Sequence, residues 1–182
     1  MKIKKIKNVI YISGLLIAVG IWSAINIAAT IPSLFSLFSS VILLIFSYTA
    51  MVFDINERRI PNTLVILMIA GWMFIITIMM FFDISGAIGI FKDSLFGLLI
   101  GGGIFLLVYL LSRKGLGGGD VKFMAAAGLY LGIAGTIPAM LYGTVLAALT
   151  GAALIILKKI DRKDTMPLVP FLFIGIMIVI TF

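Results

Sequence analysis

Two aspartates, Asp54 and Asp120, stand apart from the other acidic residues because each lies at the end of a long apolar segment. Asp54 follows the stretch SVILLIFSYTAMVF, and Asp120 follows three glycines in RKGLGGGDVKF. A carboxylate beside a membrane span is costly and commonly functional, although a single aspartate there could serve only as an interfacial anchor. Two of them at matched membrane depth favour a shared site.

A pair of close carboxylates can catalyse hydrolysis, because ionising both is costly and the pair therefore shares a proton. The ionised carboxylate takes a proton from water while the protonated one donates to a carbonyl oxygen, as in aspartic peptidases. The chain has no histidine and no cysteine, which excludes Ser–His and Cys–His catalysis within it. Asp54 and Asp120 are therefore predicted to act without a metal or a cofactor.

The glycines before Asp120 suit such a site. Without Cβ atoms they let the backbone bend and let a substrate strand approach the acid. Irregular backbone at membrane depth is tolerated where it lines a cavity. The remaining acidic residues are interpreted as solvated charges that balance nearby cations; they are Glu57, Asp83, Asp93, Asp161 and Asp164.

The elements that position these aspartates are predicted from the composition. Hydrophobic residues make up 63% of the 182 residues and charged residues 12%, with a mean hydropathy of +1.29. Water-soluble domains are much less apolar, and the apolar runs are too long for barrel strands. Residues 1–182 are therefore expected to form one polytopic domain, an all-α integral membrane bundle of about six to seven transmembrane helices.

Seven apolar segments can be marked, at residues 8–29, 33–53, 62–82, 95–111, 121–134, 138–157 and 167–181. The first is predicted to be a retained signal anchor, because its apolar run has the length of a full span; residues 33–182 would form the core. The fifth segment is short and interrupted by glycine, so it could be re-entrant or partly fused to the sixth. In the sixth, Gly143, Ala147 and Gly151 have the four-residue spacing typical of close helix packing.

The lysines and arginines predict the orientation of the bundle. With a cytoplasmic N-terminus, 13 of the 14 fall on one side and Lys92 alone on the other, as the positive-inside rule expects. The 13 are Lys2, Lys4, Lys5, Lys7, Arg58, Arg59, Arg113, Lys114, Lys122, Lys158, Lys159, Arg162 and Lys163. The site is therefore predicted near the cytoplasmic face of the cell membrane, with the C-terminus outside. We attribute the net charge of +7 to this topology and not to nucleic-acid binding.

Three stretches resemble the type IV prepilin peptidases. GLGGGDVKFMAAAGLYLG resembles their GxGD motif, with Gly117, Gly119 and Asp120 at the motif positions. FDINERRIPN resembles the segment of their first aspartate, here Asp54, and MPLVPFLFIG resembles their proline-containing C-terminal segment. The three matches follow one another in the order of the family.

Three further residues match family motifs and have simpler alternatives. Pro61 could merely begin a helix, and Asn62 could merely cap one. Lys122 could be an interfacial lysine that extends to the membrane surface. We predict that all three residues belong to the site and support its two motifs.

The resemblance implies a membrane aspartic endopeptidase that cuts short basic leader peptides from prepilin-like proteins, with Asp54 and Asp120 as the catalytic acids. Its partners would be the prepilin substrate and the lipid bilayer; the sequence does not predict an oligomeric state. Larger family members also carry an N-methyltransferase region with paired cysteines. Because this chain has no cysteine, it looks like the short form of tight-adherence pilus systems, and we expect no methyltransferase activity.

Other functions remain open from the sequence. A small transporter or channel could use a broken helix around Asp120 to hold a substrate or a proton. A non-catalytic scaffold of a secretion machine would use both acids as anchors. Presenilin-like proteases share a GxGD motif, but tyrosine precedes their first aspartate, whereas Phe53 precedes Asp54 here.

Overall fold

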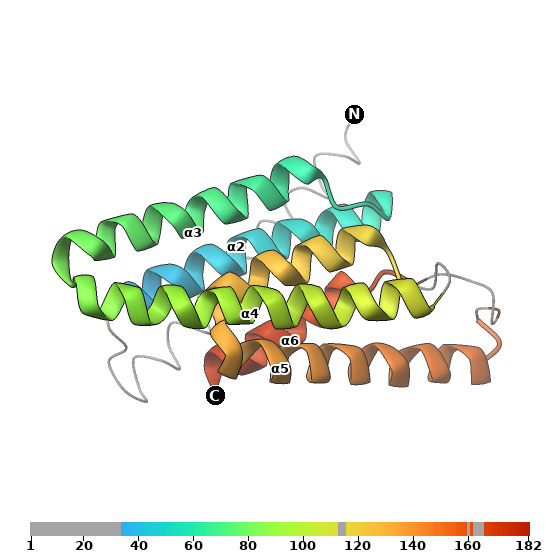
Figure 1. Ribbon diagram of the computed structural model, residues 1–182. Helices are drawn as coiled ribbons and strands as arrows, with labels where there is room; N and C mark the ends of the chain where they lie inside the picture. Colours follow the sequence, from blue (N-terminus) through green and yellow to red (C-terminus); the bar gives the residue numbers. More distant parts are fainter. Residues whose placement is uncertain (1–33, 113–115, 160, 162–165) are drawn as a thin grey trace.

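The computed structural model describes residues 34–112, 116–159, 161 and 166–182. These residues form five helices, which are α2 (Leu34–Glu57), α3 (Asn62–Phe82), α4 (Ile84–Leu111), α5 (Gly118–Ile156) and α6 (Val169–Thr181) (Figure 1). The described ranges contain no β-strand. The predicted signal anchor at residues 8–29 lies outside them, as do the cations at residues 2–7, 113–114 and 162–163 and the acid Asp164.

Four of the helices, α2 to α5, are long and apolar enough to cross a membrane. Helix α6 has 13 residues, fewer than the roughly 20 of a full span. The all-α prediction is confirmed for the described residues, while the number of six to seven spans stays a prediction. Helix α3 has the bounds predicted from the sequence, residues 62–82.

Helix α4 begins earlier than predicted, at Ile84 and not at residue 95. Asp83 explains the difference, because its side chain accepts a hydrogen bond of 2.9 Å from the N–H of Gly86 and so caps the helix. Asp93, predicted to flank a loop, therefore lies inside α4. The interpretation of Asp83 as a merely solvated charge was wrong.

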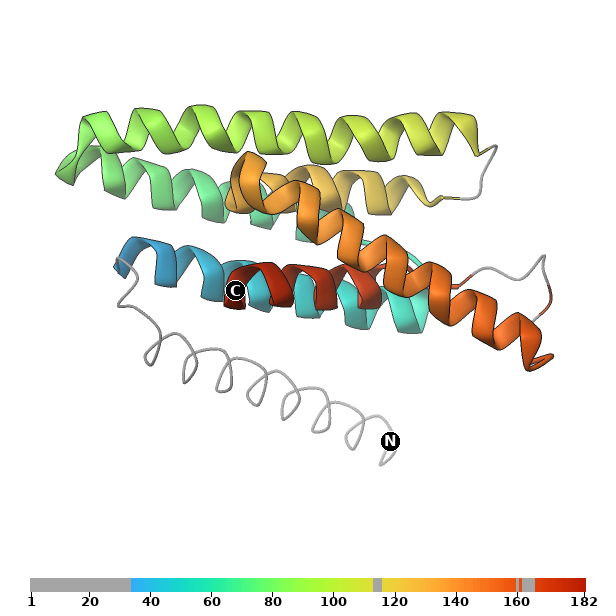
Figure 2. The ribbon, with the colours of Figure 1, turned by 90° about the horizontal axis from the view of Figure 1, so that it is seen from below.

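Helix α5 changes direction at Gly132, which has φ 62° and ψ −169°, a conformation costly for residues other than glycine. The parts before and after Gly132 run in opposite directions (Figure 2). Oδ1 of Asp93 accepts a hydrogen bond of 3.2 Å from the N–H of Ile133 and holds this turn, so Asp93 is more than a balancing charge. The predicted segments 121–134 and 138–157 thus follow each other within α5.

Glycines allow α4 and the first part of α5 to pack with their backbones in contact. A Cβ atom added to Gly97 would clash with the carbonyl oxygen of Gly128, and one added to Gly101 would lie 2.6 Å from the carbonyl oxygen of Met124. Gly97 and Gly101 are one helical turn apart, a spacing of small residues that lets membrane helices approach closely. This packing fixes the part of α5 that follows Asp120.

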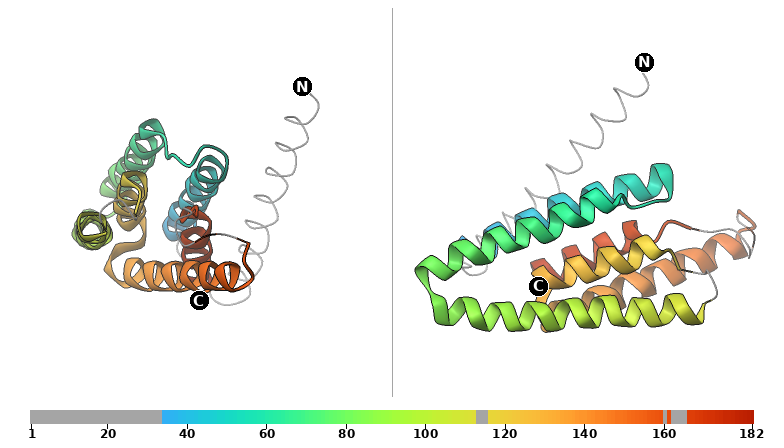
Figure 3. Two further views of the ribbon diagram at one scale, coloured as in Figure 1. Left: turned by 90° about the vertical axis from the view of Figure 1, so that its right-hand side faces the viewer. Right: turned by 45° about the horizontal axis from the view of Figure 1, so that its top comes forward.

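Helix α6 lies between α2 and the second part of α5 (Figure 3). A Cβ atom added to Gly143 would lie 2.9 Å from Cα of Leu172 in α6, and one added to Gly175 would clash with the carbonyl oxygen of Ala139. The close packing predicted at Gly143 is therefore confirmed. At Gly151 the nearest described atom to an added Cβ would be 3.8 Å away, so this glycine makes no such contact with the described residues.

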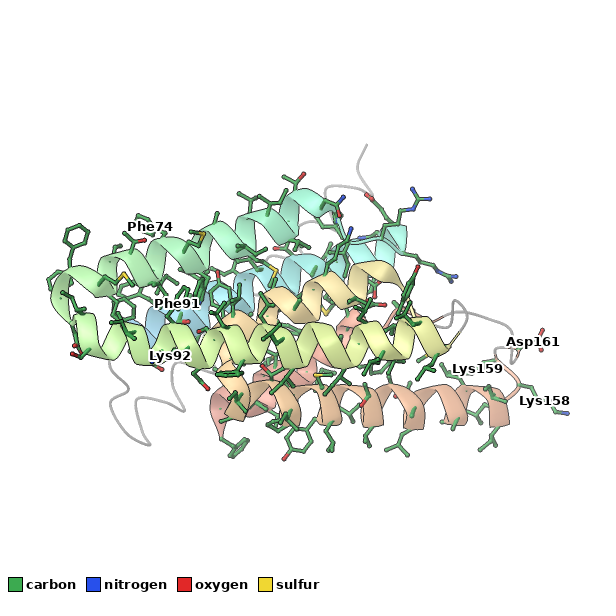
Figure 4. The ribbon with its side chains drawn as sticks, viewed as in Figure 1. Phe74, Phe91, Lys92, Lys158, Lys159 and Asp161 are labelled. Carbon is green, nitrogen blue, oxygen red and sulfur yellow. The ribbon has the colours of Figure 1, made fainter. Side chains whose placement is uncertain are left out.

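Most of the described cations lie at one end of the bundle. Lys158 and Lys159 lie there, whereas Lys92 lies toward the opposite end (Figure 4). Helix α2 also ends on the side of Lys158, directly before Arg58 and Arg59. The segregation predicted from the sequence is thus present among the cations that the structure describes.

Candidate functional site

A cavity of about 280 Å³ lies between the end of α2 and the starts of α3 and α5. Its lining residues are Asp54, Arg58, Arg59, Ile60, Asn62, Gly117, Gly118, Gly119, Asp120 and Lys122. The fold therefore brings the two predicted acids into one cavity, although they are 66 positions apart in the sequence. Of the other predicted site residues, Pro61 does not line it.

Asp54 lies in the last turn of α2 and exposes 7% of its surface. Its Oδ2 accepts a hydrogen bond of 3.0 Å from the backbone N–H of Val169, the first residue of α6. Leu168, the N-cap residue of α6, provides no side-chain hydrogen bond. Asp54 therefore satisfies an N–H at a helix start, where intrahelical acceptors are missing, and faces the positive end of the helix dipole.

The turn between α2 and α3 contains Arg58 and Arg59, which line the cavity. Helix α2 ends after Glu57, and Arg58 adopts a φ of 51°, as residues just beyond a helix commonly do. Pro61, which lacks an N–H, is the N-cap of α3 with φ −61° and ψ 135°, and its carbonyl accepts a hydrogen bond of 3.1 Å from Leu64. Pro61 thus begins a helix, as the simpler alternative expected.

Asp120 is the third residue of α5, and its side chain turns back toward the helix start. Its Oδ2 accepts a hydrogen bond of 3.1 Å from the N–H of Gly117, the N-cap residue, as the acid of a capping box does. Asp120 lines the same cavity as Asp54. Helix α5 changes direction at Gly132, within the predicted fifth segment, and Asp120 lies at the helix start; the transporter alternative stays a prediction.

The glycines were predicted to let the backbone bend and to let a substrate strand approach the acid; in the structure the run leaves room at the cavity without a left-handed backbone. Gly117 has φ −78° and ψ 139°, and none of the three glycines has a positive φ. A Cβ atom at Gly117 would lie 3.0 Å from Oδ2 of Asp120, and one at Gly119 would lie 3.3 Å from Cβ of Ile60. A Cβ atom at Gly118 would meet no atom of the described residues within 4 Å. The two outer glycines therefore have packed surroundings, and the middle one does not.

Lys122 and Asn62 join the starts of α5 and α3. Nζ of Lys122 donates a hydrogen bond of 2.9 Å to Oδ1 of Asn62, which ties two walls of the cavity together. Asn62 is the first residue of α3, and the start of this helix has no side-chain cap. The alternative that Asn62 merely caps a helix is therefore wrong, and Lys122 does more than reach the membrane surface.

Sequence reasoning did not single out Arg58, Arg59 and Ile60 as lining residues, and it missed the backbone N–H of Val169 as a partner of Asp54. The prolines in MPLVPFLFIG marked the segment, but a backbone donor has no residue-specific signal. Within the described ranges, no three His, Cys, Asp or Glu side chains group as the ligands of a metal ion do.

The fold and the cavity define a helical membrane protein with two carboxylates in a polar cavity at one end of its bundle. The chain belongs to the type IV leader peptidase family, whose sequence model matches residues 41–156. The matched range contains Asp54, the glycine run and Asp120. The family assignment predicted from the three sequence stretches is confirmed.

Two curated relatives carry the name prepilin leader peptidase/N-methyltransferase. The one from Xanthomonas campestris is 32% identical over 71 residues, which cover 39% of this chain and 25% of the relative. The one from Bacillus subtilis is 31% identical over 87 residues, which cover 46% of this chain and 35% of the relative. The matched part thus spans about a quarter to a third of these relatives. No solved structure matches the chain with significance.

Proposed function

We propose that the protein is an aspartic endopeptidase that removes leader peptides from prepilin-like proteins, with Asp54 and Asp120 as its catalytic pair. The observation that carries the proposal is the meeting of the two carboxylates in one cavity. Both acids lie within the range matched by the leader peptidase family. The names of the two relatives supply the substrate class.

In the proposed reaction, the peptide carbonyl and one water molecule enter the cavity while the two carboxyl groups hold one proton between them. The ionised carboxylate takes a proton from the water as the water oxygen attacks the carbonyl carbon. The protonated carboxyl donates to the carbonyl oxygen, and a tetrahedral diol forms. When the C–N bond breaks, one carboxyl protonates the leaving amine and the other recovers a proton from a diol hydroxyl, so the pair returns to its starting state.

The cavity is proposed to open at the cytoplasmic face of the cell membrane. It lies at the end of the bundle that carries most of the described cations, and cytoplasmic ends of membrane proteins are enriched in lysine and arginine. A prepilin could then keep its hydrophobic helix in the bilayer while its basic leader lies in the cytoplasm. The absence of methyltransferase activity, the single domain over residues 1–182 and the signal anchor stay predictions.

The test is co-expression of a prepilin with the wild-type protein, Asp54→Asn or Asp120→Asn. Each substitution keeps the side-chain volume and removes the ionisable group, so we expect both variants to reach the membrane and to leave the leader uncleaved. Asp161→Asn is the matched control, because Asp161 is exposed at the same end of the bundle but does not line the cavity.

Cleavage is read as a mobility shift of the prepilin by the size of its leader, and the new N-terminus is sequenced. Normal processing by either cavity variant would exclude the catalytic pair and favour a scaffold. Loss of processing in Asp161→Asn as well would point to a general effect of charge at this end of the bundle.

A further inference from the structure

The contact between Val169 and Asp54 joins the start of one helix to a carboxylate of the proposed catalytic pair. The two residues are 115 positions apart, and Val169 exposes 0% and Asp54 7% of its surface. A hydrogen bond from an N–H to a charged group is shorter and stronger than a neutral one. Because the donor belongs to the backbone, it has no side-chain rotamers to lose when it holds the acceptor.

The charges that share the cavity with Asp54 come from α5 and from the turn between α2 and α3. They are Arg58, Arg59, Asp120 and Lys122. Residues 166–182, which contain α6, include no charged side chain. Helix α6 therefore acts on Asp54 through its backbone alone.

Packing against α5 fixes the position of α6 along the axis of the bundle. Leu172 and Ile176 are completely buried, and added Cβ atoms at Gly143 and Gly175 would meet backbone atoms across the contact between α5 and α6. A helix packed backbone to backbone cannot slide without steric conflict. The N–H of Val169 is therefore a donor at a defined position.

We infer that the first turn of α6 is a positioning element, in which the N–H of Val169 holds Oδ2 of Asp54 and so orients this carboxylate for the reaction. This inference rests on the proposed function, because it assigns a task to Asp54 within the catalytic pair. The helix dipole of α6 adds to the effect, since the N-terminus of a helix stabilises a negative charge. The positioning residue is Val169, and its side chain takes no part.

The test removes one backbone donor without changing a side chain. Nonsense suppression in a cell-free system with nanodiscs replaces Val169 by its α-hydroxy acid, so that an ester oxygen takes the place of the N–H. The matched control is the same replacement at Leu172, whose N–H donates to the carbonyl oxygen of Leu168 at 3.2 Å in the same turn. Both proteins lose one hydrogen bond at the start of α6, and only the first loses the contact with Asp54.

We expect the Val169 ester to lower kcat for prepilin cleavage by about tenfold or more with KM unchanged, and the Leu172 ester to keep the wild-type kcat. Equal kcat values for the Val169 ester and the wild-type protein would overturn the inference. Equal losses for both esters would overturn it too, because they would reveal a general requirement for an intact α6.

A thermal double-mutant cycle separates this inference from the proposed function. In the wild-type background the Val169 ester should lower the Tm by about 3 °C or more. In an Asp54→Ala background, which has no acceptor, the same ester should leave the Tm unchanged. A wild-type protein that fails to cleave prepilin would refute the proposed function, while additive Tm changes in the cycle would refute the contact itself.

Discussion

Replacement of Gly132 by alanine is expected to destabilise the turn that reverses α5. Gly132 has φ 62° and ψ −169°, and a residue with a side chain pays about 1–3 kcal/mol there. The new Cβ atom would also clash with the carboxylate of Asp93. Displacing that carboxylate removes its hydrogen bond to Ile133, at a cost of about 1 kcal/mol. The free energy of unfolding should therefore fall by about 2–4 kcal/mol.

The measurement is thermal unfolding of the purified protein in one detergent, followed by intrinsic fluorescence. In a chain of this size a change of 1 kcal/mol moves the Tm by about 2–4 °C, so Gly132→Ala should lower it by about 4–16 °C. Gly89→Ala is the control, because a Cβ atom at Gly89 of α4 would meet nothing within 4 Å in the part of the chain that the structure describes. Alanine is also the better helix former, so this variant should match or slightly exceed the wild-type Tm.

A third variant, Asp93→Ala, divides the effect into its two parts. It removes the acceptor for Ile133 and leaves the glycine in place, so the Tm should fall by only about 2–4 °C. A Tm of Gly132→Ala within 1 °C of wild type would refute the backbone reasoning. A loss in Asp93→Ala as large as that in Gly132→Ala would show that the hydrogen bond, and not the positive φ, dominates.

Three further outcomes follow from the site and the core. Gly117→Ala should slow prepilin cleavage at least several-fold, because its Cβ atom would press on the Asp120 carboxylate at 3.0 Å. Gly103→Ala should cleave normally in the same assay, because Gly103 lies in α4, does not line the cavity, and its Cβ atom would meet no atom of the described residues within 4 Å. Ser47→Ala should keep or raise the Tm, because the Ser47 hydroxyl is buried without a hydrogen-bond partner among the described residues. Ser94→Ala should lower the Tm by about 2–4 °C, because it leaves the indole N–H of Trp72 without its acceptor. The reverse order of the two Tm values would contradict this assignment. The rate of cleavage should have a bell-shaped dependence on pH, since a fully ionised pair lacks a donor and a fully protonated pair lacks a base; a monotonic profile over the range in which the protein stays folded would exclude a shared proton.

The local properties of the sequence were sufficient for the class and for several elements. In lipid, such long apolar runs can satisfy their backbone hydrogen bonds only as helices. The described residues accordingly form helices joined by loops. Helix α3 was predicted with its observed bounds, because Pro61 and Asp83 end the apolar run on either side. Asp54 and Asp120 were recognised because an acid beside a glycine run or a span is conspicuous in so apolar a chain.

Local reasoning failed where charged residues lie within a helix. Lys92 and Asp93 were expected in or beside a loop, yet they lie inside α4. A helix near a membrane surface can carry such side chains if they reach water or a hydrogen-bond donor, as Asp93 reaches Ile133. A hydropathy pattern indicates that burying a charged side chain is unfavourable. It does not indicate which hydrogen-bond donor or acceptor elsewhere in the fold offsets this cost.

Composition and motif order in the sequence determined that the protein is helical and apolar, which family it belongs to, and which two acids to examine. Only the tertiary structure decided that these acids share a cavity, that α5 turns back at Gly132, and that the backbone of Val169 holds Asp54. The physical reason is how far apart in the sequence the interacting groups lie. Helix formation and lipid solvation depend on neighbouring residues, whereas a contact between groups 66 or 115 positions apart depends on how the helices pack.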